Sequence, residues 1–342
     1  MGESFGEACR EDARALYEIR IGWAQRFAAE HGRSFSHEQI LDTARRCLPA
    51  TASYDPEGFE EFSGIARGAR LSPEQAYVLM GLTDLRDVLA WGPLPDGMGC
   101  SSFAVAPARG ENGNLLLGQT WDLQTDNMPF VRLVRRRPDR GPATLSVTLT
   151  GCLTLIGMNE AGIAVGNTNI QTRDVRLGVQ YLSVLHRAIR AASTDEAIEA
   201  IVSAPRAGAH YYYVGGPDGR FVGLECSARQ AARFEPGARD FVHCNHALDA
   251  GIAALHPDPT QPSTLFRQNR LTELLAQHAG PVGVADLKRM LSDRTGGANC
   301  LCRYETGDVS TNACVIMSPQ TRTLHACRGQ PDRGVWRTEQ VG

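Results

Sequence analysis

The sequence changes its periodicity at one short stretch, residues 92–99, which reads Gly-Pro-Leu-Pro-Asp-Gly-Met-Gly. Before this stretch, apolar residues recur at helical spacing, as at Leu16, Ile19, Trp23 and Phe27. After it, short segments alternate between apolar and polar residues or are apolar throughout, which is typical of strands. Because Gly and Pro interrupt both helices and strands, residues 92–99 are predicted to separate a helical part from a part built on sheets.

The helical part is predicted to contain four helices. Two of them begin with a capping box, in which a Ser side chain and a Gln three residues later each accept a hydrogen bond from the other's backbone. The pairs are Ser36 with Gln39, and Ser72 with Gln75. The predicted helices cover residues 11–30, 36–48, 56–69 and 72–90.

The second part is predicted to contain blocks of antiparallel strands separated by pairs of helices. The predicted strands are 101–106, 114–121, 130–137, 143–150, 152–158, 163–170, 211–214, 221–225, 231–234, 240–244, 313–317, 323–326 and 335–337. The predicted helices are 179–192, one that begins at the capping box of Ser193 and Glu196, 263–278 and 284–292. Two sheets packed face to face, with helices outside each, bury these elements most simply. The expected fold class is therefore α+β, a four-layer α/β/β/α sandwich with a helical N-terminal segment.

Composition and charge argue against several classes of function. The formal net charge is −3, so no nucleic-acid partner is expected, and Arg135–Arg137 is interpreted as a solvated strand end. No apolar run of 18 residues exists and the N-terminus is polar, so neither a membrane partner nor a secretory signal is expected. The ten cysteines lack the spacing of a disulfide framework, and the expected location is the cytoplasm.

Cys100 is the residue that we expect to carry chemistry. It opens the first predicted strand directly after Gly99, and glycine leaves its own carbonyl accessible to attack. The thiol can attack that carbonyl and move the acyl group from nitrogen to sulfur. Hydrolysis would then free an α-amine on Cys100, and an amine with a pKa of about 8 can serve as the base for the thiol beside it. The sequence thus predicts self-cleavage between Gly99 and Cys100.

Two further polar residues are candidates for the same site. Asn245 follows the predicted strand 240–244, where its amide could donate to an oxyanion. Asp122 ends the strand that pairs back toward Cys100, where it could orient the new ammonium group. His243 and His246 are ligand-type residues, but strand alternation sends His243 and Asn245 to one face and His246 to the other, so no metal site is predicted.

Four motifs, in this order, resemble those of the acyl-coenzyme A:6-aminopenicillanic acid (isopenicillin N) acyltransferase family of N-terminal nucleophile hydrolases. They are Met98–Ser102, Gly118–Asp122, Gly157–Val165 and His243–His246. Residues 60–68 and 301–303 resemble further elements of that family. The resemblance is more distant to penicillin V acylases and bile salt hydrolases.

The resemblance implies a nucleophile at Cys100, a catalytic Asp at Asp122 and an oxyanion Asn at Asn245. It also implies that residues 1–99 are cleaved from the catalytic core, residues 100–342, and stay associated with it. Substrate contacts are expected at Trp121, Asn167 and Arg303. Because the positions after Val165 depart from the fungal acyltransferase, the resemblance does not carry over a substrate.

The expected activity is to cleave or form an amide bond of a small molecule through a thioester at Cys100. The partners would be a small amide or acyl donor and, for transfer, an amine acceptor; no cofactor is expected. Hydrolysis and acyl transfer share every catalytic part, so the sequence leaves both open. Two alternatives are an unprocessed, non-catalytic binding module of the same fold and a metal-dependent hydrolase.

Overall fold

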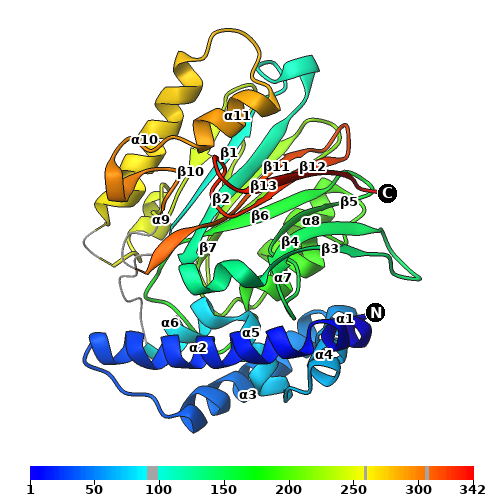
Figure 1. Cartoon of the computed structure of the whole chain (residues 1–342), viewed down its shortest axis with the longest axis vertical. Helices are drawn as coiled ribbons and strands as arrows, with labels where there is room; N and C mark the ends of the chain where they lie inside the picture. The colour runs from blue at the N-terminus through cyan, green and yellow to red at the C-terminus, as the bar shows by residue number, and fades with distance from the viewer. Residues whose placement is uncertain (91–98, 258–259, 305–307) are drawn as a thin grey trace.

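The computed structural model describes residues 1–90, 99–257, 260–304 and 308–342. Two antiparallel sheets face each other, and helices pack on the outer face of each (Figure 1). The predicted four-layer α+β sandwich is therefore confirmed. The breaker-rich residues 92–98 lie outside the described residues. Among the helices in these ranges, none is long and apolar enough to cross a membrane.

The N-terminal part is helical up to residue 90. Its helices are α1 Gly2–Ala8, α2 Arg10–Glu30, α3 His37–Tyr54, α4 Pro56–Ala69, α5 Pro73–Met80 and α6 Leu82–Ala90. Both capping boxes are present, at Ser36 and at Ser72. Helix α1 adds to the predicted set, and the predicted helix 72–90 is divided at Gly81. A Cβ on Gly81 would stand 3.0 Å from the side chain of Gln180, a contact between segments far apart in the sequence.

Helices α1 and α4 pack backbone against backbone. A Cβ added at Gly2 or Gly6 would collide with the carbonyl oxygens of Glu61 and Ile65, and one at Gly68 with that of Glu3. Small residues are therefore required on both helices, because larger side chains would force them apart.

The first sheet has the order β10-β1-β2-β11-β12-β13. Its strands are β1 Gly99–Val105, β2 Leu116–Gln124, β10 Phe241–His243, β11 Val309–Ser318, β12 Thr323–Arg328 and β13 Val335–Gln340. Long-range pairing thus brings the chain after residue 308 beside β2, and the short strand β10 beside β1.

The second sheet is a meander in which β3 to β9 follow one another in sequence order. Its strands are β3 Val131–Arg136, β4 Thr144–Leu149, β5 Ile156–Asn159, β6 Ala164–Asn169, β7 His210–Gly215, β8 Phe221–Cys226 and β9 Ala231–Phe234. The predicted strand 152–158 begins only at Ile156, because the chain turns first at Gly151, where φ is +67°.

The outer layers bury apolar side chains against each sheet. Helices α7 Tyr181–Ala188 and α8 Thr194–Val202 cover the second sheet, where Val184 and Ile201 belong to one cluster with Val165 and Val214. Helices α10 Pro262–Gln277 and α11 Val284–Leu291 cover the first sheet. Between the sheets, the main core continues into α2, α3 and α5. The helical segment is therefore part of the hydrophobic core. The short α9, Ala250–Ala253, follows β10.

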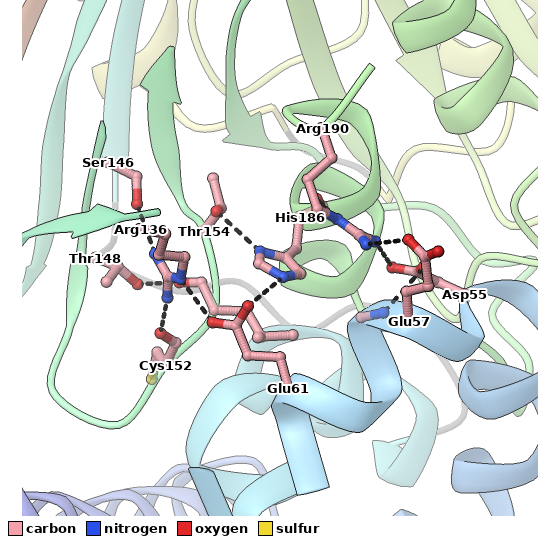
Figure 2. A network of polar contacts seen from close by, with 12 residues as sticks. Asp55, Glu57, Glu61, Arg136, Ser146, Thr148, Cys152, Thr154, His186 and Arg190 are labelled. Atoms are coloured by element: carbon pink, nitrogen blue, oxygen red, sulfur yellow. Dashed lines mark hydrogen bonds and ion pairs between the residues drawn. The ribbon is translucent and has the colours of Figure 1, made fainter. Parts of the chain in front are cut away.

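A buried charge network ties α4 to the second sheet and to α7 (Figure 2). Glu61 accepts a hydrogen bond of 2.7 Å from Arg136 Nε and lies 3.2 Å from His186 Nε2. Arg136 also donates to Ser146 Oγ and to the carbonyl oxygen of Cys152. Beside this network, Arg190 pairs with Asp55.

Arg136 corrects the interpretation of the arginine run. Its side chain is only 3% exposed, so it is not part of a solvated strand end. Although burial acts in the opposite direction, His186 and Arg136 hold the pKa of Glu61 well below its usual range. The ionised carboxylate therefore stabilises the packing of α4 on the sheet.

Candidate active site

Gly99 and Cys100 begin β1 next to the end of β2. The pairing register places Gly99 opposite Asp122 and Cys100 opposite Trp121. Residues directly opposite each other share a face of the sheet. Cys100 and Trp121 belong to the core between the sheets, whereas Gly99 and Asp122 face the layer of α10.

The Cys100 thiol is enclosed. The residue is 6% exposed, and its backbone N–H donates to Asn245 Oδ1 at 2.8 Å. Burial, together with the charge of Asp122, raises the pKa of the thiol to about 12. In the intact chain the thiol is therefore protonated at neutral pH, and a base must take its proton before it can attack.

Arg267 on α10 links the groups around Cys100. Its guanidinium donates to the carbonyl oxygen of Cys100, to Ser101 Oγ at 3.0 Å and to Asn245 Oδ1 at 2.8 Å. The residue is 1% exposed. A Cβ on Gly99 would stand 2.9 Å from Arg267 Nη2. Only glycine fits at position 99 without displacing this guanidinium.

Arg267 is a site residue that sequence reasoning missed, although the sequence contains a signal for it. In α10 the buried residues Thr264, Arg267, Leu271 and Leu275 recur at helical spacing. A charged residue within the buried stripe of an amphipathic helix is costly unless it has partners. Its position in that stripe could have marked it as functional.

Asn245 bridges the two sheets at this end of the sandwich. Its backbone N–H donates to Thr264 Oγ1 at 2.7 Å, and its Nδ2 donates to the carbonyl oxygen of Asn169 at 2.8 Å. Its Oδ1 accepts from both Cys100 and Arg267, which fixes the orientation of the amide. Nδ2, the atom expected to donate to an oxyanion, therefore already donates to the Asn169 carbonyl in the intact chain.

The two carboxylate oxygens of Asp122 differ in their hydrogen bonding. Oδ1 accepts a hydrogen bond from Thr311 Oγ1 at 2.7 Å, whereas Oδ2 has no partner among the described residues. Burial raises the pKa of Asp122, and the charges of Arg303 and Arg267 oppose that rise. An ammonium group on Cys100 would give this buried carboxylate a counter-charge.

The other predicted site residues lie around this group. Arg303 donates to the carbonyl oxygen of Ala298, and its Nη1 is 3.3 Å from the position of a Cβ on Gly99. Asn167 on β6 contacts His210 Nδ1 at 3.2 Å, and its Oδ1 has no partner in the described part of the chain. Trp121 is 6% exposed, beside Cys100.

The histidines near Asn245 do not join this group. Strand β10 ends at His243, so the predicted alternation does not extend to Asn245 and His246. His243 stacks on Tyr211 and contacts Glu225 at 2.7 Å, whereas His246 contacts Thr264. Within the described ranges, no three His, Cys, Asp or Glu side chains are placed to hold a metal ion together.

The chain belongs to the acyl-coenzyme A:6-aminopenicillanic acid acyl-transferase family, whose model matches residues 108–333. The chain is also 28% identical, over 258 residues, to the 40 kDa form of acyl-coenzyme A:6-aminopenicillanic-acid-acyltransferase from Emericella nidulans. That match covers 73% of this chain and 69% of the relative. Family membership supports an enzyme of acyl or amide transfer or hydrolysis. The family match begins after Cys100, so the assignment of Cys100 as nucleophile depends on the chemistry and contacts of the site.

Three solved structures show weaker likeness. An N-acylethanolamine-hydrolyzing acid amidase ortholog from Caenorhabditis elegans is 12% identical, with a TM-score of 0.46 over 65% of this chain and 93% of that one. A variant of conjugated bile acid hydrolase from Clostridium perfringens is 13% identical, with a TM-score of 0.45 over 71% and 97%. Penicillin V acylase from Agrobacterium tumefaciens is 16% identical, with a TM-score of 0.44 over 67% and 83%. The family assignment does not depend on these likenesses.

Proposed function

We propose that this chain is a self-cleaving enzyme that breaks or forms an amide bond of a small molecule through a thioester at Cys100. The observation that carries the proposal is the contact set at the bond before Cys100. The Cys100 nitrogen of that bond donates to Asn245 Oδ1, Arg267 donates to the carbonyl oxygen of Cys100, and Gly99 leaves room for the Arg267 guanidinium.

Self-cleavage would proceed by exchange of one bond for another. The sulfur of Cys100 bonds to the carbonyl carbon of Gly99 while the bond to the Cys100 nitrogen breaks. The proton of the thiol goes to that nitrogen, which becomes an amine. Water then hydrolyses the thioester, leaving a carboxylate on Gly99 and a free thiol on Cys100.

Turnover would use the new amine as a base. It takes the thiol proton as sulfur attacks the substrate carbonyl, and it returns a proton to the departing amine. Asn245 Nδ2 is the side-chain donor assigned to the oxyanion, which requires it to leave the Asn169 carbonyl. Asp122, with its open oxygen, would hold the ammonium form.

The second half-reaction decides the product. If water attacks the thioester, the enzyme is an amidohydrolase; if an amine attacks, it is an acyltransferase. Both use the same residues. Residues 1–99 would stay bound to residues 100–342 after cleavage, because the core cluster and the Glu61 network cross from one segment to the other.

Intact-mass spectrometry of the purified wild type and of Cys100→Ala tests the proposal. Two wild-type fragments, beginning at Met1 and at Cys100, are expected, together with an undivided Cys100→Ala chain. Cys226→Ala removes a different buried thiol, on β8, and should cleave like the wild type. A wild type that stays whole, or a Cys100→Ala chain that divides, would overturn self-cleavage.

A further inference from the structure

A buried carboxylate on the second sheet contacts the segment that carries Asn245. Glu225 lies on β8 opposite Tyr211, a residue of the core between the sheets. The Glu225 side chain is 0% exposed, and its Oε1 lies 2.7 Å from Nε2 of His243, on β10 of the first sheet. Side chains from the two sheets therefore meet in a buried pair, two positions before Asn245.

The same carboxylate also holds the backbone that follows Asn245. The N–H of Leu248 donates to Glu225 Oε1 at 2.6 Å, and the N–H of Asp249 donates to Oε2 at 2.9 Å. Glu225 thus contacts both ends of the segment 243–249, the side chain of His243 at one end and two backbone groups at the other. Because Asn245 lies between these contacts, they restrict the positions that its backbone can adopt.

The hydrogen bonds of His243 assign a positive charge to its ring. Nδ1 lies 3.0 Å from the carbonyl oxygen of Cys244, which can only accept. Nε2 faces the Glu225 carboxylate, which already accepts from two backbone N–H groups. Both ring nitrogens are therefore donors, and an imidazolium pairs with an ionised carboxylate. Because burying two charges is costly and their attraction only about offsets that cost, such a pair is better suited to specifying one arrangement than to adding stability.

Asn245 is held from the opposite side by α10, since Thr264 Oγ1 accepts from its backbone N–H at 2.7 Å. Its Nδ2 donates to the carbonyl oxygen of Asn169 at 2.8 Å and has to turn away from that oxygen to reach an oxyanion. The side chain must therefore move while the backbone beneath it stays in place. Anchors on both sides, Thr264 and Glu225, meet that requirement.

We propose that Glu225 is a positioning residue that keeps Asn245 in place for the oxyanion. It acts through His243 and through the backbone of Leu248 and Asp249. The inference rests on the proposed function of Asn245, and it gives the second sheet a part in the reaction. A donor displaced by about 1 Å can cost a factor of about 100 in rate, so the position of this segment should affect turnover.

The first test is a double-mutant cycle on the kcat of the cleaved enzyme for hexanoyl p-nitroanilide. Glu225→Gln should lower kcat by about 10- to 100-fold and leave KM nearly unchanged, because only the transition state loses a contact. In the Asn245→Asp background the oxyanion donor is already absent, so adding Glu225→Gln should lower kcat no further. A residue that is only structural would lower kcat by the same factor in both backgrounds.

Glu61→Gln is the matched control for this cycle. It also removes a buried carboxylate that contacts a histidine, His186, but on α4 and away from Cys100. Compared per folded, cleaved enzyme, it should leave kcat unchanged in both backgrounds. If Glu225→Gln does not fold, Glu225→Asp takes its place, because it keeps the charge beside His243 and shortens the reach to the two backbone groups.

The second test measures the segment without chemistry. In the intact Cys100→Ala chain, Glu225→Gln should speed amide hydrogen exchange in a peptide covering residues 244–249 by about 10- to 100-fold, because hydrogen bonds to a charged group are lost there. Adding Glu61→Gln instead should leave exchange in this peptide unchanged. Mass spectrometry of the peptide measures both.

The two tests separate the inference from the proposed function. If exchange becomes faster but the wild type does not hydrolyse the anilide, the anchoring of the segment stands and the proposed activity fails. If the wild type hydrolyses the anilide but Glu225→Gln leaves kcat or exchange unchanged, the activity stands and the positioning role is overturned. Equal factors for Glu225→Gln with and without Asn245→Asp also overturn it.

Discussion

Arg267 and Asn245 are joined by a hydrogen bond of 2.8 Å from Nη2 to Oδ1. The same oxygen accepts from the backbone nitrogen of Cys100, so one amide group connects a buried guanidinium to the bond that we expect to break. Each member of this set depends on the others for its hydrogen bonds. Variants at Arg267, Gly99 and Asn245 should therefore differ in informative ways.

Replacing Arg267 by Met should slow self-cleavage by about 100-fold or more, because it removes the hydrogen bonds to the Cys100 carbonyl and to Asn245, the residue that accepts from the Cys100 nitrogen. Hydrogen bonds to charged groups contribute about 1.5–3 kcal/mol each. Arg267→Lys keeps the charge but loses the forked geometry, and an intermediate rate is expected. The fraction of intact chain against time, measured by mass spectrometry, gives both rates. Cleavage at the wild-type rate in Arg267→Met would show that the guanidinium is only structural.

Gly99→Ala should slow self-cleavage about 10-fold or more, because the new methyl group would stand 2.9 Å from Arg267 Nη2 and displace a guanidinium held by several partners. The fraction of intact chain against time, measured by mass spectrometry, gives this rate. The matched control is Gly22→Ala on α2, whose nearest neighbour would be a flexible arginine end at 3.3 Å. That variant should cleave normally, and equal rates for the two would contradict the steric argument.

Asn245→Asp separates the two functions of this side chain. A carboxylate can still accept from the Cys100 nitrogen and from Arg267, so self-cleavage should persist. It cannot donate to an oxyanion, so turnover of an amide substrate by the cleaved enzyme should fall by about 100- to 1,000-fold. Asn245→Ala should lose both self-cleavage and turnover, because alanine can neither accept these hydrogen bonds nor donate one. The test compares the kcat of cleaved Asn245→Asp with that of the cleaved wild type. An unchanged kcat would show that Asn245 does not stabilise the oxyanion.

Glu61→Gln should destabilise the intact Cys100→Ala chain by about 3–5 kcal/mol at pH 7, as expected when one member of a buried ion pair is removed. The pKa of Glu61 is lowered in the folded state, so its contribution is present above the unfolded value of about 4.3 and is lost as the pH falls. The difference between the two chains should therefore shrink between about pH 5 and pH 3.

Urea unfolding across this pH range measures that difference. Glu57→Gln is the control, because its side chain is 89% exposed and its contact with Arg190 is long, at 3.4 Å. It should unfold like the parent chain. A difference for Glu61→Gln that stays constant down to pH 3 would rule out the charge of Glu61 as its source.

Most of the secondary structure follows from local patterns. Ser36 and Ser72 begin helices as their capping boxes indicate, and the alternating segments from Ser101 to Asn169 become strands. These signals are local because caps and periodicity act within a few residues. The division at Gly81 and the late start of β5 escaped prediction, because each depends on a partner or a turn outside the local pattern.

Some residues of the candidate site were predictable from the sequence and others were not. Cys100, Asp122 and Asn245 were named from their positions at strand ends, and the structure brings them together, while their roles stay predictions. Arg267 was missed, although its place in a buried helical stripe was visible. Arg136 was misread as solvated, because a run of three arginines does not reveal that Glu61, from a helix far away in the sequence, neutralises one of them.

The sequence by itself determined the order of helices and strands, the sandwich class and the position of the cysteine after a glycine. Those properties depend on propensity, periodicity and the chemistry of neighbouring residues. Only the tertiary structure decided that Arg267 donates to Asn245 and that the buried Arg136 pairs with Glu61. The reason is physical: the energetic effect of a buried charge depends on the groups packed around it, and long-range packing places those groups.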